Sequence, residues 1–190
     1  MVAVARHGQT YSNLSGQWIG KGDDPLNETG MEQSRRLSDL LKGYSFNFVI
    51  SSDAKRAIQT AEIIAERLGI HFNGGTEVLR GRYTGRLSAE EIEEKLGVKM
   101  TSTLSIGLDR FDGTEKISEV LFRVRSFVGF LQKEFTGRRI ILITHESLVR
   151  AFYTLYVKNP EEILFGNCSH FVMKLGLGKT DLVRDITSIS

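Results

Sequence analysis

A chain of 190 residues is long enough to bury a sizeable core, and we expect residues 1–190 to form a single domain. Lys and Arg total 25 against 23 Asp and Glu, and this near balance argues against general binding to nucleic acids. The only cysteine, Cys168, excludes an internal disulfide, and the apolar N-terminal run is too short for a signal peptide or a membrane span. We therefore expect a cytoplasmic protein that does not associate with membranes.

The first part of the chain begins with a predicted strand and a long loop. Residues 2–5 are apolar and lead directly into Arg6 and His7, which indicates a buried strand with polar residues at its end. Residues 9–29 are rich in Gly, Asn, Ser and Asp, a composition typical of a loop, with room for one helical turn. Thr29 is then the predicted cap of a helix whose apolar stripe ends at Gly43.

The middle of the chain alternates between strand and helix patterns. Residues 46–50 form the second predicted strand, and an apolar stripe predicts a helix over residues 54–68. Ser88 with Glu91 three residues later matches a capping box, so another helix is expected there. The longest helical pattern covers residues 115–135.

The last part of the chain completes an alternating order of elements. Residues 140–144 are an unbroken run of mostly β-branched residues, typical of a strand that is covered on both faces. A predicted helix over residues 148–157 follows, and two strands, 171–175 and 181–186, are expected to form a hairpin. This order predicts an α/β fold, a three-layer α/β/α sandwich with a mostly parallel central sheet.

Two histidines and two arginines are expected at one edge of this sheet. His7 and His145 each follow a predicted strand directly. Arg6 precedes the first histidine, and Arg56 lies in the first turn of the helix after the second strand. Ligands of open α/β sheets bind outside the carboxyl ends of the strands. One such histidine alone is more often an ordinary loop residue, but two histidines with two arginines predict a functional site.

The chemistry that suits this set is phosphoryl transfer. Guanidinium groups match phosphate oxygens in pairs, and a neutral imidazole is a competent nucleophile near pH 7. Neighbouring cations disfavour protonation of the imidazole and stabilise the charge on the phosphoryl oxygens, so we expect no metal ion and no cofactor. The remaining histidines, His71 and His170, have no Cys or carboxylate at the spacing of a zinc site.

Four motifs follow one another in order along the chain. They are Arg6-His7-Gly8-Gln9-Thr10 with Asn13 behind it; Gly20, Asp23, Pro25 and Leu26 with Gly30 and Gln33; the run Ser-Ser-Asp-Ala-Lys-Arg-Ala-Ile-Gln-Thr-Ala over residues 51–61; and Thr-His-Glu-Ser-Leu-Val-Arg-Ala over residues 144–151, followed by Asn-Cys-Ser at 167–169. This series resembles the histidine phosphatase superfamily, also called the phosphoglycerate mutase-like family. The resemblance covers most of the chain and implies the fold of that family.

The resemblance implies the roles of the four residues at the sheet edge. His7 is expected to carry the phosphoryl group as a phosphohistidine. Arg6, Arg56 and His145 are expected to hold the phosphoryl oxygens.

Further residues are expected near the substrate or phosphate because they match, or replace, residues of the family motifs. Gly8 would allow a close approach of the backbone, Thr10 belongs to the same signature, and Asn13 would add a hydrogen bond. Arg82 matches an arginine of the glycolytic mutases. Glu146 replaces a residue that is commonly Gly.

The general acid of the family is missing from its usual position. The family pattern Glu-x-Leu-x-Glu-x-x-x-Gly reads Glu-Val-Leu-Arg-Gly-Arg-Tyr-Thr-Gly over residues 77–85, so Gly81 stands where the acid is expected. General acid catalysis typically contributes about 10²–10⁴ in rate, so this departure bears directly on activity. Glu77, Glu115 and Glu146 are candidate substitutes, although each one alone is also typical of an ordinary surface carboxylate.

The expected function is metal-independent phosphoryl transfer to or from a small-molecule phosphomonoester. The short chain favours a phosphatase, which is a hydrolase, over a phosphoglycerate mutase, which is an isomerase with long insertions that we do not find. The match of Arg82 to the mutases keeps that alternative open. The alternative from another class is a binding module that recognises phosphorylated ligands without turning them over.

Overall fold

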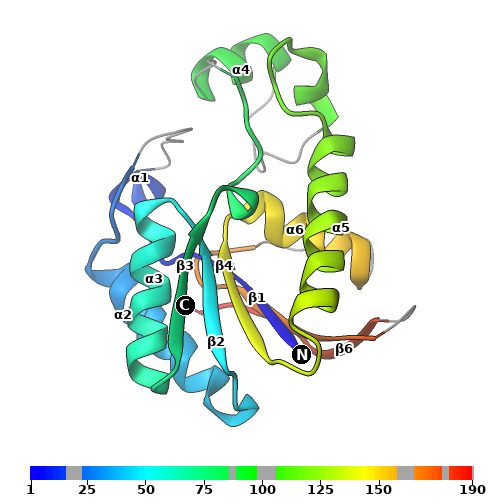
Figure 1. Cartoon of the computed structure of the whole chain (residues 1–190). Coiled ribbons are helices and arrows are strands. Elements are labelled where there is room, and N and C mark those ends of the chain that lie inside the picture. Colours follow the sequence, from blue (N-terminus) through cyan, green and yellow to red (C-terminus); the bar gives the residue numbers. More distant parts are fainter. Residues whose placement is uncertain (16–22, 86–88, 98–105, 158–164, 177–179, 190) are drawn as a thin grey trace.

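The computed structural model describes residues 1–15, 23–85, 89–97, 106–157, 165–176 and 180–189. These residues surround a six-stranded sheet with the order β3-β2-β4-β1-β5-β6 (Figure 1). Its strands are β1 (Val2–Arg6), β2 (Phe48–Ser52), β3 (His71–Thr76), β4 (Ile140–Thr144), β5 (His170–Leu175) and β6 (Thr180–Thr187). Strands β3, β2, β4 and β1 are parallel, β5 runs antiparallel to β1, and β6 runs antiparallel to β5. The predicted mostly parallel sheet is confirmed.

Helices cover both faces of the sheet. Helices α2 (Glu28–Leu41) and α3 (Lys55–Leu68) lie on one face, and α5 (Ile117–Glu134) and α6 (Glu146–Tyr156) lie on the other (Figure 1). The shorter helices are α1 (Tyr11–Leu14), α4 (Ala89–Leu96) and the 3-10 turns η1 (Lys42–Tyr44), η2 (Glu77–Leu79) and η3 (Ile106–Arg110). Among the described residues, no helix is both long and apolar enough to cross a membrane. The three layers are those predicted from the sequence.

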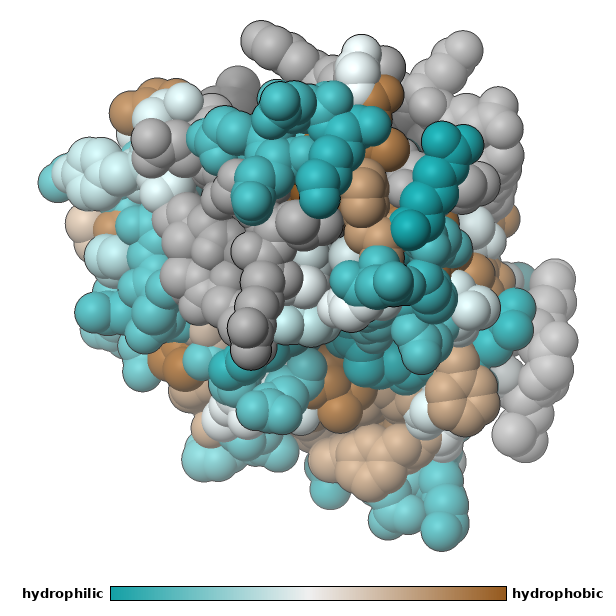
Figure 2. Space-filling view, turned by 90° about the horizontal axis from the view of Figure 1, so that it is seen from above, coloured by the Kyte–Doolittle hydropathy of each residue, from teal (hydrophilic) through white to brown (hydrophobic). Residues whose placement is uncertain are grey.

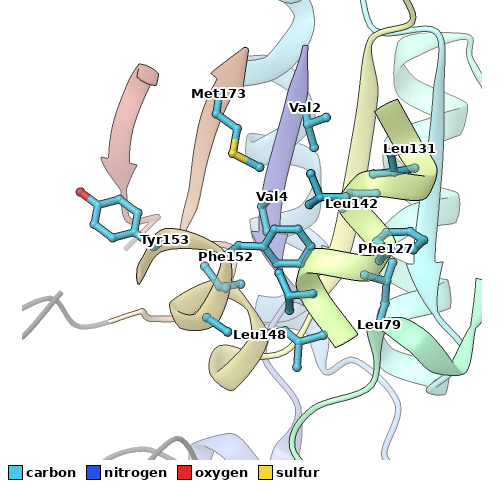
Figure 3. Close-up of a cluster of buried hydrophobic side chains, with 14 of the residues drawn as sticks. Val2, Val4, Leu79, Phe127, Leu131, Leu142, Leu148, Phe152, Tyr153 and Met173 are labelled. Carbon is cyan, nitrogen blue, oxygen red and sulfur yellow. The ribbon is translucent and has the colours of Figure 1, made fainter. Parts of the chain in front are cut away.

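The strands alternate their side chains between the two helical layers. Val2 and Val4 join the cluster formed with α5 and α6, whereas Ala3 and Ala5 join the cluster formed with α2 and α3. Figure 3 shows the first cluster, where Phe127 and Leu131 of α5 meet the strands. Full burial of such an aliphatic or aromatic side chain contributes about 1.5–3 kcal/mol. These two cores hold the central strands in place, and so they fix the position of the residues at the carboxyl end of each strand.

Three local predictions differ from the structure. Thr29 is not the cap of α2: Asn27 is, because its side-chain oxygen accepts a hydrogen bond from the Gly30 N–H at 2.8 Å. Strand β2 begins two residues later than predicted and continues through two buried serines, because it pairs with a strand on each side. Strand β3 was not predicted. Ser88, the predicted cap of α4, lies outside the described residues.

Candidate active site

The pairing of β1 with β4 brings the two histidines together. Arg6 lies opposite Thr144 in the parallel ladder, and the His7 N–H donates to the Thr144 carbonyl oxygen at 2.9 Å. His7 and His145 are therefore the next residues of two neighbouring strands, and their ring centroids lie 5.1 Å apart. The predicted meeting of these histidines at the carboxyl edge of the sheet is observed.

Arg56 joins the two imidazole rings and defines the tautomer of His7. The Arg56 Nε–H donates to Nε2 of His7 at 3.2 Å. Because a guanidinium has donors only, this Nε2 must carry a lone pair, and the proton lies on Nδ1. Nδ1 is 2.7 Å from the Gly8 carbonyl oxygen and donates to it. The unprotonated Nε2 of His7 therefore faces Arg56. An anion bound by Arg56 would lie close to the lone pair of this nitrogen.

The same argument defines the tautomer of His145. A second Arg56 nitrogen lies 3.3 Å from Nδ1 of His145 and donates to it. The proton of His145 is therefore on Nε2, which donates to the hydroxyl oxygen of Ser52 at 2.9 Å. Ser52 ends β2, next to β4 in the sheet, so three strand ends contribute to this arrangement.

Burial keeps both histidines neutral. His7 is 3% exposed and His145 is 8% exposed. Burial lowers the pKa of His7 well below its usual value, and His145, Arg56 and Arg6 lower it further. Burial likewise lowers the pKa of His145, helped by Arg56, Arg6, Arg80 and Arg123. At neutral pH the cage formed by Arg6, His7, Arg56 and His145 therefore holds two cations and two neutral rings.

Arg6 carries a donor that no described residue satisfies. One of its terminal nitrogens donates to the Phe165 carbonyl oxygen at 2.8 Å, which holds the side chain in place. Its Nε is buried and has no hydrogen-bond partner among the described residues. An unpaired buried donor typically costs about 1–3 kcal/mol. A ligand oxygen would remove that cost.

Gly8 and Thr60 hold the loop that carries His7. A Cβ at Gly8 would lie 2.4 Å from the Gly30 carbonyl oxygen, so the glycine is required by the close approach of α2. The Gly8 N–H donates to the hydroxyl of Thr60 at 3.0 Å, and that hydroxyl donates to the Arg56 carbonyl oxygen at 2.8 Å. Thr60 therefore joins the backbone next to His7 to the helix that presents Arg56.

Thr10 and Asn13 organise the turn that follows the signature. Thr10 caps α1 in a reciprocal capping box with Asn13. The side-chain oxygen of Asn13 accepts a hydrogen bond from the Asn167 amide at 2.9 Å, and that amide also lies 3.2 Å from the His7 carbonyl oxygen. Both residues thus lie beside the cage, where their described contacts hold the loop together.

Arg82 is directed into the protein by its described contacts. Its side chain is fully buried, its Nε donates to the Glu115 carbonyl oxygen at 2.7 Å, and it forms an ion pair with Asp109. These contacts favour a structural role over the predicted contact with substrate.

The three candidate acids have different surroundings. Both carboxylate oxygens of Glu115 accept hydrogen bonds from Arg123, at 2.9 and 2.8 Å. Glu146 pairs with Arg150 at 2.9 Å in the first turn of α6. Glu77 is exposed at the start of η2.

Gly81 lies directly against the cage. A Cβ built there would be 3.3 Å from Cβ of His145 and 3.4 Å from the hydroxyl of Ser147. The position that the sequence assigns to an acid is therefore beside the second histidine, and it presents only backbone.

Sequence reasoning did not single out Ser52 and Thr60. A signal was present for both: Thr60 is four residues after Arg56, on the same helical face, and Ser52 lies between the strand predicted over residues 46–50 and the helix that carries Arg56. Among the described residues, no group of three or more His, Cys, Asp or Glu side chains is arranged to hold a metal ion.

Fold and cage together indicate an α/β enzyme of the phosphoryl-transfer class. The chain belongs to the histidine phosphatase superfamily, since the model for branch 1 of that family matches residues 2–185. The fold and family predicted from the sequence are thus confirmed, as is an enzyme of the phosphatase or mutase type.

Comparisons with individual proteins give names of both types. Phosphoglycerate mutase-like protein 4 of Arabidopsis thaliana is 28% identical over 158 residues, 80% of this chain and 69% of the relative. The uncharacterized phosphatase PhoE of Bacillus subtilis is 27% identical over 153 residues, 80% of this chain and 75% of the relative. The structure of YhfR from Bacillus stearothermophilus has a TM-score of 0.83 at 20% identity, covering 97% of this chain and 95% of that one.

Proposed function

We propose that this protein hydrolyses phosphomonoesters through a phosphohistidine on His7, without a metal ion. The observation that carries the proposal is the cage itself. A lone pair on Nε2 of His7 faces Arg56, and the buried Nε of Arg6 has no described partner. Two cations with two neutral rings match the charge of a phosphate dianion, and preorganised donors of this kind stabilise the charge of the transition state.

The reaction takes two steps. In the first, the lone pair on Nε2 of His7 forms a bond to phosphorus, and the ester P–O bond breaks with its electron pair on the leaving oxygen. In the second, water attacks phosphorus, the N–P bond breaks, and its electron pair returns to Nε2. Inorganic phosphate is released, and the protons of water are shared between the phosphate and the departed oxygen. Throughout, Nδ1 of His7 stays bonded to the Gly8 carbonyl oxygen, which keeps the ring oriented.

The mutase alternative is favoured by one match in the sequence and weakened by one set of contacts. Arg82 corresponds to an arginine of the mutases. Its side chain forms an ion pair with Asp109 and a hydrogen bond with the Glu115 carbonyl oxygen. Hydrolysis needs only the cage and water; the coloured part of the face in Figure 2 carries hydrophilic patches with hydrophobic residues between them. The contacts of Arg82 favour water as the phosphoryl acceptor.

The test is turnover of p-nitrophenyl phosphate in EDTA, with His7→Ala and the matched variant His71→Ala. His71 is an exposed histidine at the start of β3, so its replacement should leave activity unchanged. We expect acid-labile phosphate on the wild type after rapid quenching, and loss of both label and turnover in His7→Ala. Binding of phosphate without turnover would instead identify a binding module, and transfer of label to phosphoglycerate would identify a mutase.

A further inference from the structure

We infer that this protein acts on phosphoryl compounds whose leaving group departs as a stable anion, aryl and acyl phosphates, and not on alkyl phosphates. The inference rests on the proposed function and adds the substrate class. It follows from where the protons of the cage are, from which groups surround His145, and from what lies at position 81.

None of the cage side chains has a proton to give to a leaving oxygen. The proton of His7 is on Nδ1 and is bonded to the Gly8 carbonyl oxygen. The proton of His145 is on Nε2 and is hydrogen-bonded to Ser52, so Nδ1 of His145 can only accept a hydrogen bond. Arginine does not deprotonate in proteins. The cage therefore binds and attacks a phosphoryl group but does not act as a general acid.

The charged groups that influence His145 most are all arginines. After burial, the pKa of His145 is lowered by Arg56, Arg6, Arg80 and Arg123, in that order. The last two are held in ion pairs. Arg80 donates to both oxygens of Asp53, at 2.5 and 2.7 Å, and Arg123 donates to both oxygens of Glu115. Both oxygens of Asp53 and of Glu115 therefore already accept hydrogen bonds from an arginine.

Position 81 is where a side chain would reach the cage. A Cβ there would lie 3.3–3.4 Å from Cβ and Cγ of His145 and from the hydroxyl of Ser147. The φ angle of Gly81 is not in the left-handed region, so the backbone accepts a side chain there once its neighbours shift by a few tenths of an ångström. Glycine therefore presents no carboxyl group at this position, beside His145 and Ser147.

The consequence is a dependence on the leaving group. A phenol has a pKa of about 10, and a phenolate or carboxylate departs without prior protonation, whereas an alkoxide does not. General acid catalysis typically contributes about 10²–10⁴ in rate. We expect the hydrolysis of alkyl phosphates to be slower by that factor, because no general acid protonates the leaving oxygen. The rate for a nitrophenyl ester should change little.

The experiment is a series of para-substituted phenyl phosphates, with kcat/KM plotted against the pKa of the leaving phenol. Substituents change the leaving group while the shape of the substrate stays similar. The wild type should show a steep decline as the pKa of the phenol rises, and alkyl phosphates should fall further below the line. A flat plot with efficient turnover would overturn the inference while leaving the proposed function intact. Absence of turnover across the whole series would overturn both.

Position 81 supplies matched variants for the same series. Gly81→Glu should flatten the plot and raise turnover of an alkyl phosphate relative to the nitrophenyl ester, by up to about 10²–10⁴. Gly81→Gln has nearly the same shape and no acid, so it should keep the steep plot of the wild type. The inference does not depend on these variants folding, because the plot for the wild type alone supports or refutes it.

Discussion

Thr60 is expected to act as a positioning residue for His7, and replacement by valine tests this. Its hydroxyl accepts from the Gly8 N–H at 3.0 Å and donates to the Arg56 carbonyl oxygen at 2.8 Å. Thr60→Val keeps the shape of the side chain and removes both hydrogen bonds. The loop that carries His7 then no longer has a hydrogen-bonded link to the helix that carries Arg56.

The size of the effect follows from these contacts. Thr60 is fully buried, so the valine leaves the Gly8 N–H unpaired, which costs about 1–3 kcal/mol. That cost is relieved when the loop moves, and a shift of about 1 Å in a reacting group can reduce the rate by about 10². We expect kcat/KM for p-nitrophenyl phosphate to fall by about 10- to 100-fold, mostly through kcat.

Thr60→Ser is the matched control. It removes one buried methyl group, which lowers the free energy of unfolding by about 1 kcal/mol, but it keeps the hydroxyl. Both variants should therefore have a lower Tm, and only the valine should lose kcat. Rates should be measured well below both values of Tm, with rapid quenching to count the phosphorylated enzyme. A folded Thr60→Val protein with the kcat/KM of the wild type would refute the positioning role.

Three further predictions concern charge. The pKa values of His7 and His145 are well below 6.5, so both rings should stay neutral as the pH falls through 6.5. We therefore expect kcat/KM, corrected for ionisation of the substrate, to stay constant over that range. A fall in kcat/KM centred at pH 6.5 would contradict the lowered pKa values. Burial lowers the pKa of His170 to about 4. Between about pH 4 and 6.5 the unfolded chain therefore binds more protons than the folded protein, so the free energy of unfolding should fall as the pH drops through that window. Urea unfolding should show a smaller fall in His170→Phe. Arg82→Leu breaks the pair with the partly exposed Asp109 and should lower the free energy of unfolding by about 1–3 kcal/mol; an increase in KM without loss of stability would instead assign Arg82 to the substrate.

The central strands and the two histidines could be predicted from the sequence because their signals are local. Residues 2–5 and 140–144 are continuous apolar runs, and the structure has β1 and β4 there. A parallel sheet then requires the residues after these strands to meet at one edge. That rule predicts that His7 and His145 lie together, and their ring centroids are 5.1 Å apart.

Strand β3 could not be predicted because its stability is not local. Its sequence, His-Phe-Asn-Gly-Gly-Thr, has low β-propensity and none of its residues is fully buried. It forms because β2 offers a parallel partner and because Gly75 fits against the Asp53 backbone, where a Cβ would lie 2.8 Å from Cα of that residue. Such a fit depends on tertiary packing that no window of sequence contains.

The direction of Arg82 was equally hidden from the sequence. The motif predicts a contact with substrate, and the structure adds an ion pair with Asp109, 27 residues away in a segment without a recognisable pattern. Ion pairs between distant segments leave no periodicity, so a motif match predicts the position of the backbone better than the target of a long side chain.

The place of β1 in the sheet has a consequence for how the protein refolds. Its ladder partners, Ile140 to Thr144 on one side and His170 to Met173 on the other, are more than 130 residues away along the chain. Contacts of such high sequence separation form slowly, because closing the long intervening loop costs chain entropy before the contacts offset it. Local helices such as α3 can appear early, yet Thr144 and Cys168 do not hold the His7 backbone until β1 has taken its place beside β4 and β5. Recovery of catalytic activity should therefore coincide with the last refolding phase and report completion of the whole topology.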